Sequence, residues 1–281
     1  MVNEGITSML LDRVKDNDSI SIRIPRGAKI NEPYRETSIA QHTLVVMEED
    51  SQLTYINEGY SKSIEVHIAP GAALSFLNLG KGYEDLYRDT SFSFSIGENA
   101  VAHLFFIDLG RSLLKREIRV CLLGDNARSN IRGLYILEGN ESLEYHIVQE
   151  HRAPFTTSNL IYRGILKDNA KGILKGEIAV KKEARQSDAY QINHILILGE
   201  NPSIDTVPIL EIETNDLKRC THGTTVGRID EEILFYTKTR GLDDKDATKL
   251  ISMGFLIEIL DGIPIEEEVT ELIEERLEAN V

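Results

Sequence analysis

Two soft metal ligands, Cys220 and His222, lie two residues apart where the strand-like part of the sequence ends. In an extended strand, residues two apart project from the same face, so the thiolate and the imidazole could reach one metal ion. A thiolate together with an imidazole suits an iron–sulfur cluster, zinc or copper(I). Two ligands do not complete a site, however, and a buried cysteine is more often only a small apolar side chain.

Further donors occur in the two preceding strand-like stretches. Glu211 and Glu213 share one face of PILEIE, and Asn193 and His194 lie in QINHILIL. If the stretches are neighbours in the fold, these groups could join the cysteine and the histidine. If the last strand met its copy across a two-fold axis, each subunit would supply the same ligands, and four soft donors would converge. This arrangement predicts a homodimer with a metal site at its interface.

Other residues that could carry chemistry give weaker signals. Cys121 lies between Val120 and Leu122 in an apolar run, so we expect an inert core thiol. His146 and His151 are five residues apart, which places them on opposite faces of a strand and favours structural roles. The sequence contains no P-loop, GxGxxG, GxSxG or HExxH motif, so nucleotide hydrolysis through a P-loop is not expected.

Short stretches with strand-like patterns follow one another from residue 19 to about residue 226. An acid–Asn group recurs in the turns, at residues 97–100, 124–127, 167–170 and 199–202, and Gly and Asn tolerate the positive φ of tight turns. Repetition at intervals of roughly 20–50 residues is typical of solenoids. A β-sandwich would also have many short strands. The repeated turn favours an irregular β-solenoid, with uneven spacings caused by loop insertions.

The composition divides the chain into three parts. Residues 1–18 are expected to form a short helix or cap, with an apolar stripe of Ile6, Met9, Leu10 and Val14. Residues 19–228 form the β core. Residues 229–281 hold fifteen acidic and five basic residues, and so carry about −10 of the net charge of −15.

This acidic tail predicts three short helices, which begin near Asp230, after residues 243–244, and at about residue 265. Each helix has a single apolar stripe and is too small to form a generous core of its own. The helices must therefore pack on the β core, on each other or on a partner.

The bulk composition excludes several classes of protein. Two cysteines in 281 residues indicate a reducing cytoplasm rather than a disulfide framework. No apolar stretch is long enough to span a membrane, and the first residues do not have the pattern of a secretory signal. The negative charge disfavours nucleic-acid binding, which requires basic surface.

Three stretches resemble the SufB/SufD family of iron–sulfur cluster assembly scaffold proteins. The first is EHRAPFTTSNLIYRGIL at residues 150–166, which is similar to the family's H-x-A-P-x-T-x-S pattern. The second covers residues 187–242, and the third is the DAxxxIxxGF pattern that begins at Asp246. Residues 1–140 match the family only in style.

The resemblance implies a right-handed parallel β-helix followed by a C-terminal helical domain. It further implies dimerisation through the edge of the β-helix, and docking of a separate ABC-type ATPase, SufC, on the C-terminal helices. His222 and Cys220 match the histidine and cysteine that SufD-type members have in a K-C-S-H-G motif. Gly223 and Asn193 stand where SufB-type members have a Glu and a cluster-associated Cys, so the motif is closer to SufD.

We therefore expect a cytoplasmic, homodimeric scaffold, not an enzyme, that holds a nascent iron–sulfur cluster through Cys220 and His222. Its partners would be a SufC-like ATPase, a sulfur donor and apo-protein recipients. The alternative is a structural SufD-like subunit that binds the ATPase and a partner scaffold without a metal of its own. A β-helix enzyme acting on polysaccharide is disfavoured, because the chain has no Trp for a sugar platform.

Overall fold

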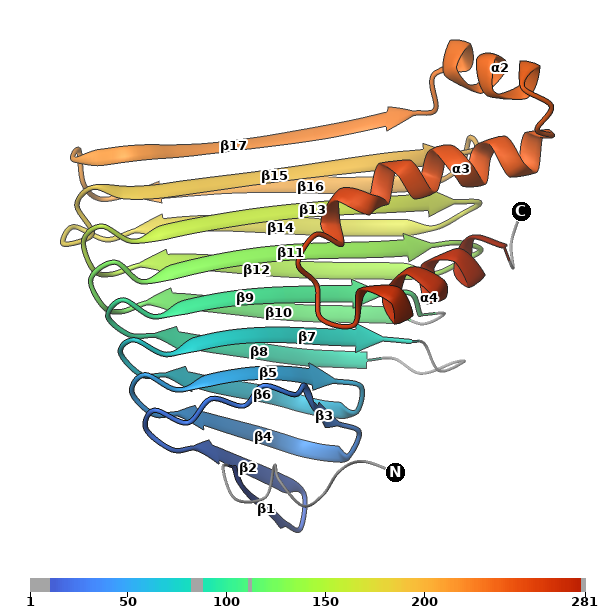
Figure 1. The fold of residues 1–281 in the computed structure, drawn as a ribbon. Helices are drawn as coiled ribbons and strands as arrows, with labels where there is room; N and C mark the ends of the chain where they lie inside the picture. Colours follow the sequence, from blue (N-terminus) through green and yellow to red (C-terminus); the bar gives the residue numbers. More distant parts are fainter. Residues whose placement is uncertain (1–10, 82–87, 111–112, 279–281) are drawn as a thin grey trace.

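The chain winds into two β-sheets that lie face to face, in a computed structural model that describes residues 11–81, 88–110 and 113–278 (Figure 1). From β2 (Ser19–Ile24) onward, consecutive strands alternate between the sheets. Neighbours within a sheet run parallel, apart from the antiparallel pair of β1 (Asp12–Asp16) and β2 at the N-terminal edge. Each coil therefore adds one strand to each sheet, in a right-handed winding (Figure 1). Parallel neighbours confirm the β-solenoid and exclude the β-sandwich, whose sheets are antiparallel.

The two sheets divide the strands by number. Sheet A consists, in spatial order, of β1 (Asp12–Asp16), β2 (Ser19–Ile24), β4 (Ile39–Met47), β6 (Tyr60–Ile68), β8 (Arg88–Ile96), β10 (Leu113–Leu122), β12 (Ser142–His151), β14 (Lys171–Val180) and β16 (Ser203–Ile212). Sheet B consists of β3 (Tyr34–Glu36), β5 (Gln52–Asn57), β7 (Ala73–Gly80), β9 (Val101–Asp108), β11 (Arg128–Leu137), β13 (Thr157–Lys167), β15 (Ser187–Leu198) and β17 (Leu217–Arg228).

The main hydrophobic core lies between the sheets, because every second side chain of each strand points inward. On β2 the inward residues Ile20, Ile22 and Ile24 are at most 1% exposed, and they alternate with exposed neighbours. Aromatic rings stack from coil to coil, with centroid distances of 5.5 Å for Tyr55–Phe76 and 6.0 Å for Phe76–Phe106. These contacts join the core of three successive coils, whereas Ile178, Val180, Ala184 and Ala189 form a separate apolar cluster near the C-terminal end of the solenoid.

The turns that lead from sheet A to sheet B explain the repeated acid–Asn group. Asn99 and Asn126 each have a positive φ in their turns, a backbone conformation that favours Gly, Asn or Asp. The N–H of Asn99 donates to the carbonyl of Asp125 in the next turn (2.9 Å), and that of Asn126 donates to Pro154 (3.2 Å). The turns are thus hydrogen-bonded to one another along one edge of the solenoid.

The uneven spacing of the repeat has a different cause from the one expected. The copies at residues 97–100 and 124–127 lie at the edge where sheet A leads to sheet B, whereas those at 167–170 and 199–202 lie at the opposite edge. The long interval between the second and third copies therefore reflects a change of edge and not a loop insertion.

The helix predicted for residues 1–18 is wrong for residues 12–16, which form a strand. Ile6, Met9 and Leu10 lie outside the described residues, but Val14 is in strand β1, which pairs antiparallel with β2. A two-residue turn at Asn17, whose φ is 46°, and Asp18 joins the two strands. Residues 12–16 therefore belong to the β-structure, because a tight turn places them beside the first coil.

The C-terminal helices follow the predicted starts. They are α2 (Glu231–Thr239), α3 (Asp244–Leu256), the 3₁₀ turn η1 (Ile257–Ile259) and α4 (Glu266–Glu278). Asp230 caps α2 by accepting from the N–H of Glu232 (2.8 Å), and Asp243 caps α3 by accepting from that of Asp246 (2.8 Å). Among the described residues, no helix is long and apolar enough to cross a membrane.

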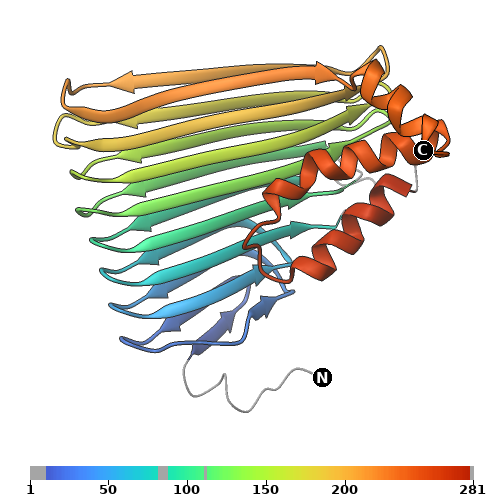
Figure 2. The ribbon, with the colours of Figure 1, turned by 45° about the horizontal axis from the view of Figure 1, so that its top comes forward.

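Helices α3 and α4 pack on the outer face of sheet B, whereas α2 projects beyond the end of β17 (Figures 1 and 2). Leu256 of α3 and Val269 and Ile273 of α4 are fully buried in a second apolar cluster, which includes Phe105 and Leu134 of the sheet. Ion pairs surround this contact: Arg163–Glu258, Arg132–Asp261, Arg35–Glu268 and Lys81–Glu268. In contrast, α2 buries none of its residues.

Candidate functional site

Cys220 and His222 lie on β17, the last strand of sheet B, and face the interior side of the solenoid. In the register with β15, Cys220 pairs with Ala189 and His222 pairs with Gln191, both of which are buried between the sheets. Cys220 is half-buried against Ile178, Val180, Ala184 and Ala189, whereas His222 is exposed. The pair therefore shares one face, as the spacing of two predicts.

The solenoid is open at this end. Strands β16 and β17 are 10 and 12 residues long, and each is the outermost strand of its sheet (Figure 1). Leu210 and Ile212 of β16 pair with the inward residues Ile178 and Val180, yet they remain 36% and 43% exposed. Their side chains point toward a core that the described part of the chain does not complete.

The thiol of Cys220 lies in an apolar setting. Burial raises the pKa of Cys220 above its ordinary value, so the thiol is protonated at neutral pH. A metal ion that binds there must displace the proton, because the thiolate is the ligand.

The donors of β15 fall on two different faces. Asn193 is 1% exposed and faces the interior, in register with Thr224, one rung along from the Gln191–His222 pair. His194 faces outward, where burial and the nearby Arg163 lower the pKa of its imidazole. Asn193 therefore lies on the face of Cys220 and His222, and His194 on the opposite one.

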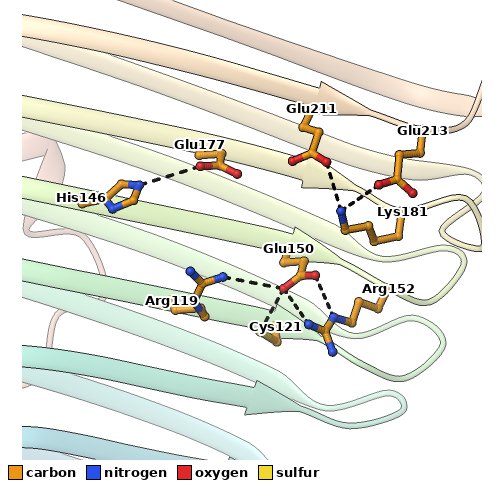
Figure 3. Close-up of polar contacts among 9 residues, drawn as sticks. All are labelled: Arg119, Cys121, His146, Glu150, Arg152, Glu177, Lys181, Glu211 and Glu213. Carbon is orange, nitrogen blue, oxygen red and sulfur yellow. Dashed lines mark hydrogen bonds and ion pairs between the residues drawn. The ribbon is translucent and has the colours of Figure 1, made fainter.

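The carboxylates near the end of β16 also face outward. Glu211 pairs with Ala179 of β14, and its side chain accepts from Lys181 at 3.2 Å, while Glu213 accepts from the same ammonium group at 2.8 Å (Figure 3). The hydrogen bond from Lys181 lowers the pKa of Glu213. Within one subunit these carboxylates lie on the outer face of sheet A, separated from the Cys220–His222 pair on the inner face of sheet B.

Among the described residues of one chain, no three His, Cys, Asp or Glu side chains are grouped so that they could hold a metal ion. The described residues of one chain therefore do not provide a complete set of such ligands around Cys220. Cys220 and His222 thus lie at the open end of the solenoid, where β16 and β17 have no further strand beside them.

Cys121 is not a core thiol. Val120 and Leu122 face the interior, so Cys121 faces outward from sheet A, where its thiol donates to Glu150 at 3.6 Å (Figure 3). Arg152 holds Glu150 at 2.8 Å. Burial and the Glu150 carboxylate raise the pKa of Cys121, which keeps the thiol protonated.

The two histidines of β12 lie on opposite faces, as predicted. His146 is on the outer face, 3.8 Å from Glu177 (Figure 3). His151 is fully buried and hydrogen-bonded to Thr156 (2.7 Å) and Ser158 (2.8 Å). Burial lowers the pKa of His151 to about 4, so the ring is neutral and has a structural role.

Residues 30–255 match the family described as the SufBD core domain of SUF system FeS cluster assembly. The chain belongs to the SufBD family. It is similar to an iron–sulfur cluster assembly SufBD family protein of Mycobacterium leprae, at 27% identity over 76% of this chain and 56% of that protein. It is 32% identical to SufD of Escherichia coli, over 60% of this chain and 40% of SufD. SufB of Bacillus subtilis is 22% identical, over 92% of this chain and 60% of SufB. The chain thus spans about half the length of such relatives.

Three amide side chains lie inside this SufBD core, and the sequence analysis identifies only one of them, Asn193. Gln149, Gln191 and Asn193 are at most 1% exposed and face the interior near the open end. The sequence analysis gives Asn193 as a candidate ligand and does not identify the two glutamines. The available signal was a polar residue at an inward position of an otherwise apolar alternation, as Gln191 is between Ala189 and Ile195.

Proposed function

We propose that this SufBD family chain is a scaffold subunit for iron–sulfur cluster assembly, which pairs with a second copy through its open end. The nascent cluster, as cargo, would be held between the Cys220–His222 pairs of the two subunits. The observation that carries this proposal is the position of both side chains on the inward face of a coil that the chain leaves unfinished.

The open end favours a second copy as the occupant. Unpaired edges of this length invite pairing with another strand. Around a two-fold axis, β16 and β17 would each meet their own copy, which continues both sheets across the interface. This pairing would cover Leu210, Ile212 and the half-exposed Val226. It would also bring two thiols and two imidazoles into a common interior.

The chemistry of the donors fits an iron–sulfur cargo. Thiolate and imidazole are both ligands of iron in such clusters. Because the thiol of Cys220 is protonated before binding, cluster loading would release protons and would weaken as the pH falls. Asn193 faces the same interior and is a candidate oxygen donor.

A SufC-like ABC ATPase is the proposed partner of α2. Ile233, Phe235 and Tyr236 of this helix are 54%, 70% and 58% exposed, and their apolar surface has no contact that buries it in the described chain. Exposed aromatic residues on one helix are typical of a docking surface. Helices α3 and α4 bury apolar residues against sheet B, whereas α2 buries none, so we assign the partner to α2. The ATPase cycle would act on the end of the solenoid to which α2 is attached.

Anaerobic reconstitution with iron and sulfide tests the scaffold role. We expect thiolate-to-iron charge-transfer absorption in the dimeric wild-type protein, and its loss in Cys220→Ala and His222→Ala. Cys121→Ala is the matched control, because Cys121 is the other cysteine and faces outward from the opposite sheet. Loss of the cluster in Cys121→Ala with retention in Cys220→Ala would overturn the ligand assignment.

The second candidate is a structural SufD-like subunit without a metal of its own. It is favoured by the 32% identity to SufD of Escherichia coli, against 22% to SufB of Bacillus subtilis. If this role is correct, the wild-type homodimer will bind no stoichiometric iron and sulfide, although α2 will still bind the ATPase.

A further inference from the structure

Gln191 has an environment that its own subunit does not satisfy. The residue is 1% exposed, and neither atom of its amide has a hydrogen-bond partner among the described residues. Buried amides are nearly always hydrogen-bonded, because loss of water without a new partner is unfavourable. Gln149 of β12 is buried and unpartnered in the same way. The amides of Gln191 and Gln149 therefore have hydrogen-bonding capacity that the described side chains and backbone do not use.

The space for Gln191 is provided by a glycine on the opposite sheet. A Cβ atom at Gly176 of β14 would lie 2.1 Å from Nε2 of Gln191. Any side chain at position 176 would therefore displace the amide from the interior. The absence of a side chain at Gly176 thus leaves room for the amide of Gln191 in the interior, on the strand next to β17.

The strand register places Gln191 beside His222. The two residues pair across β15 and β17 and face the same interior. Adjacent strands are about 4.8 Å apart, and polar side chains in register elsewhere in this solenoid reach each other over that distance. The examples are Asn57–Asn78 (2.8 Å), His42–Ser63 (2.8 Å), Asn130–Asn159 (2.9 Å) and Asn130–His103 (3.5 Å).

The Asn130–His103 rung is the closest analogue, because it joins an amide to an imidazole in register. Gln191 is one methylene longer than asparagine and has the same relation to His222. We propose that Gln191 is a positioning residue, which hydrogen-bonds one ring nitrogen of His222 when the open end is covered and leaves the other nitrogen for the metal. Such outer partners fix the orientation and tautomer of a ligating imidazole. The inference rests on the proposed function of His222.

Titration of the dimeric protein with Co²⁺ under anaerobic conditions tests this role, since Co²⁺ reports thiolate and imidazole ligation by its absorption bands. Gln191→Leu, which keeps the size but removes the amide, is expected to weaken Co²⁺ binding roughly 10- to 100-fold. Gln191→Asn should restore most of the affinity, because Asn130 reaches an imidazole in the same strand register on the outer face of sheet B. Gln149→Leu is the matched control and should bind Co²⁺ as the wild type does.

The outcomes separate the inference from the proposed function. If Gln191→Leu and Gln149→Leu weaken binding equally, or if Gln191→Asn restores nothing, Gln191 has no positioning role although His222 remains a ligand. If the wild type and His222→Ala bind Co²⁺ equally well, His222 is not a ligand, and the proposed function and the inference are both wrong. Thermal unfolding and the dimer fraction of each variant, measured in parallel, show whether a loss of binding is only a loss of structure.

Discussion

The outermost strands at the two ends of the solenoid differ in charge and in burial. At the N-terminal end, β1 covers the edge of sheet A antiparallel to the other strands, and four of its five residues, in DRVKD, are charged. Charged edge strands discourage pairing with another chain. At the C-terminal end no residue of β16 or β17 is buried, and Leu210 and Ile212 face an unfinished core. In sheet A, the N-terminal edge is thus charged, whereas the C-terminal edge leaves apolar side chains uncovered.

The buried residues show the same contrast. The inward side chains of β2 are at most 1% exposed although β2 belongs to the first coil, because Leu11, Ala28 and Ile30 complete the core around them. The inward side chains of β16 have no such cover. A protein that only needed to end its fold could have closed both ends in the first way. The uncovered apolar side chains make the C-terminal end the better candidate for a partner-binding surface.

The largest effect is expected from a charge placed in the open end. Ile212→Lys would put an ammonium group into the proposed interface, where an unpaired charge costs several kcal/mol, and should raise the dimer dissociation constant by more than about 100-fold. Light scattering after size exclusion measures the effect, and cluster retention should fall with the dimer.

Val14→Lys is the matched control at the other end, because Val14 is 61% exposed on β1. It should change neither the dimer nor the cluster. Equal effects of the two substitutions would remove the distinction between the ends.

Helix α2 is attached to the open end, and α4 reaches toward the first coils through Glu268, so the helices extend the comparison. Phe235→Ser should lower binding of a purified SufC-type ATPase by at least about 10-fold, measured by calorimetry, with the free energy of unfolding unchanged within about 0.5 kcal/mol. Val269→Ser should do the reverse and destabilise the fold by about 2–4 kcal/mol, because Val269 is fully buried against sheet B.

Removal of residues 229–281 is a less informative test of the same point. The deletion would uncover Phe105, Leu134 and the other apolar residues that α3 and α4 bury on sheet B. A loss of ATPase binding could then follow from aggregation. If Phe235→Ser binds the ATPase as well as the wild type does, α2 is not the docking surface.

The N-terminal end should be sensitive to acid. Burial alone would raise the pKa of Glu36, but hydrogen bonds from Arg13, Ser38 and Tyr34 outweigh it and lower the pKa to about 2. Because this folded value lies below the ordinary 4.5, the ionised carboxylate stabilises the fold above about pH 4.5. The contribution, about 3 kcal/mol, is lost as the pH falls toward 2.

Denaturant unfolding of the wild type and Glu36→Gln between pH 7 and pH 2 measures this contribution. The difference in unfolding free energy should be constant above pH 5 and should shrink toward zero near pH 2. A difference that does not change with pH would mean that the carboxylate is not ionised in the folded protein.

The sequence alone predicts the features that depend on the alternation of inward and outward side chains within one strand. The shared face of Cys220 and His222 follows from a spacing of two, and the repetition of the acid–Asn turn indicates the solenoid. The face of Glu211 could not be predicted, because it depends on how β16 is phased against β14. The outward position of Cys121 could not be predicted for a related reason, because an apolar run does not reveal which of its residues point inward.

The smallest predicted effect concerns a turn in the middle of the solenoid, far from both ends. Asn126 has a φ of 59°, and its side chain donates to Oδ1 of Asn99 (3.2 Å). Asn126→Ala should therefore destabilise the monomer by about 1–2 kcal/mol, since alanine tolerates the left-handed region poorly. Asn126→Gly removes the side chain without this backbone cost and should lose only about half as much. Denaturant unfolding of the two variants measures the difference, and neither change should alter dimerisation. If the alanine and glycine variants are equally stable, the hydrogen-bonded turns do not depend on the positive φ, and the repeated Asn has another cause.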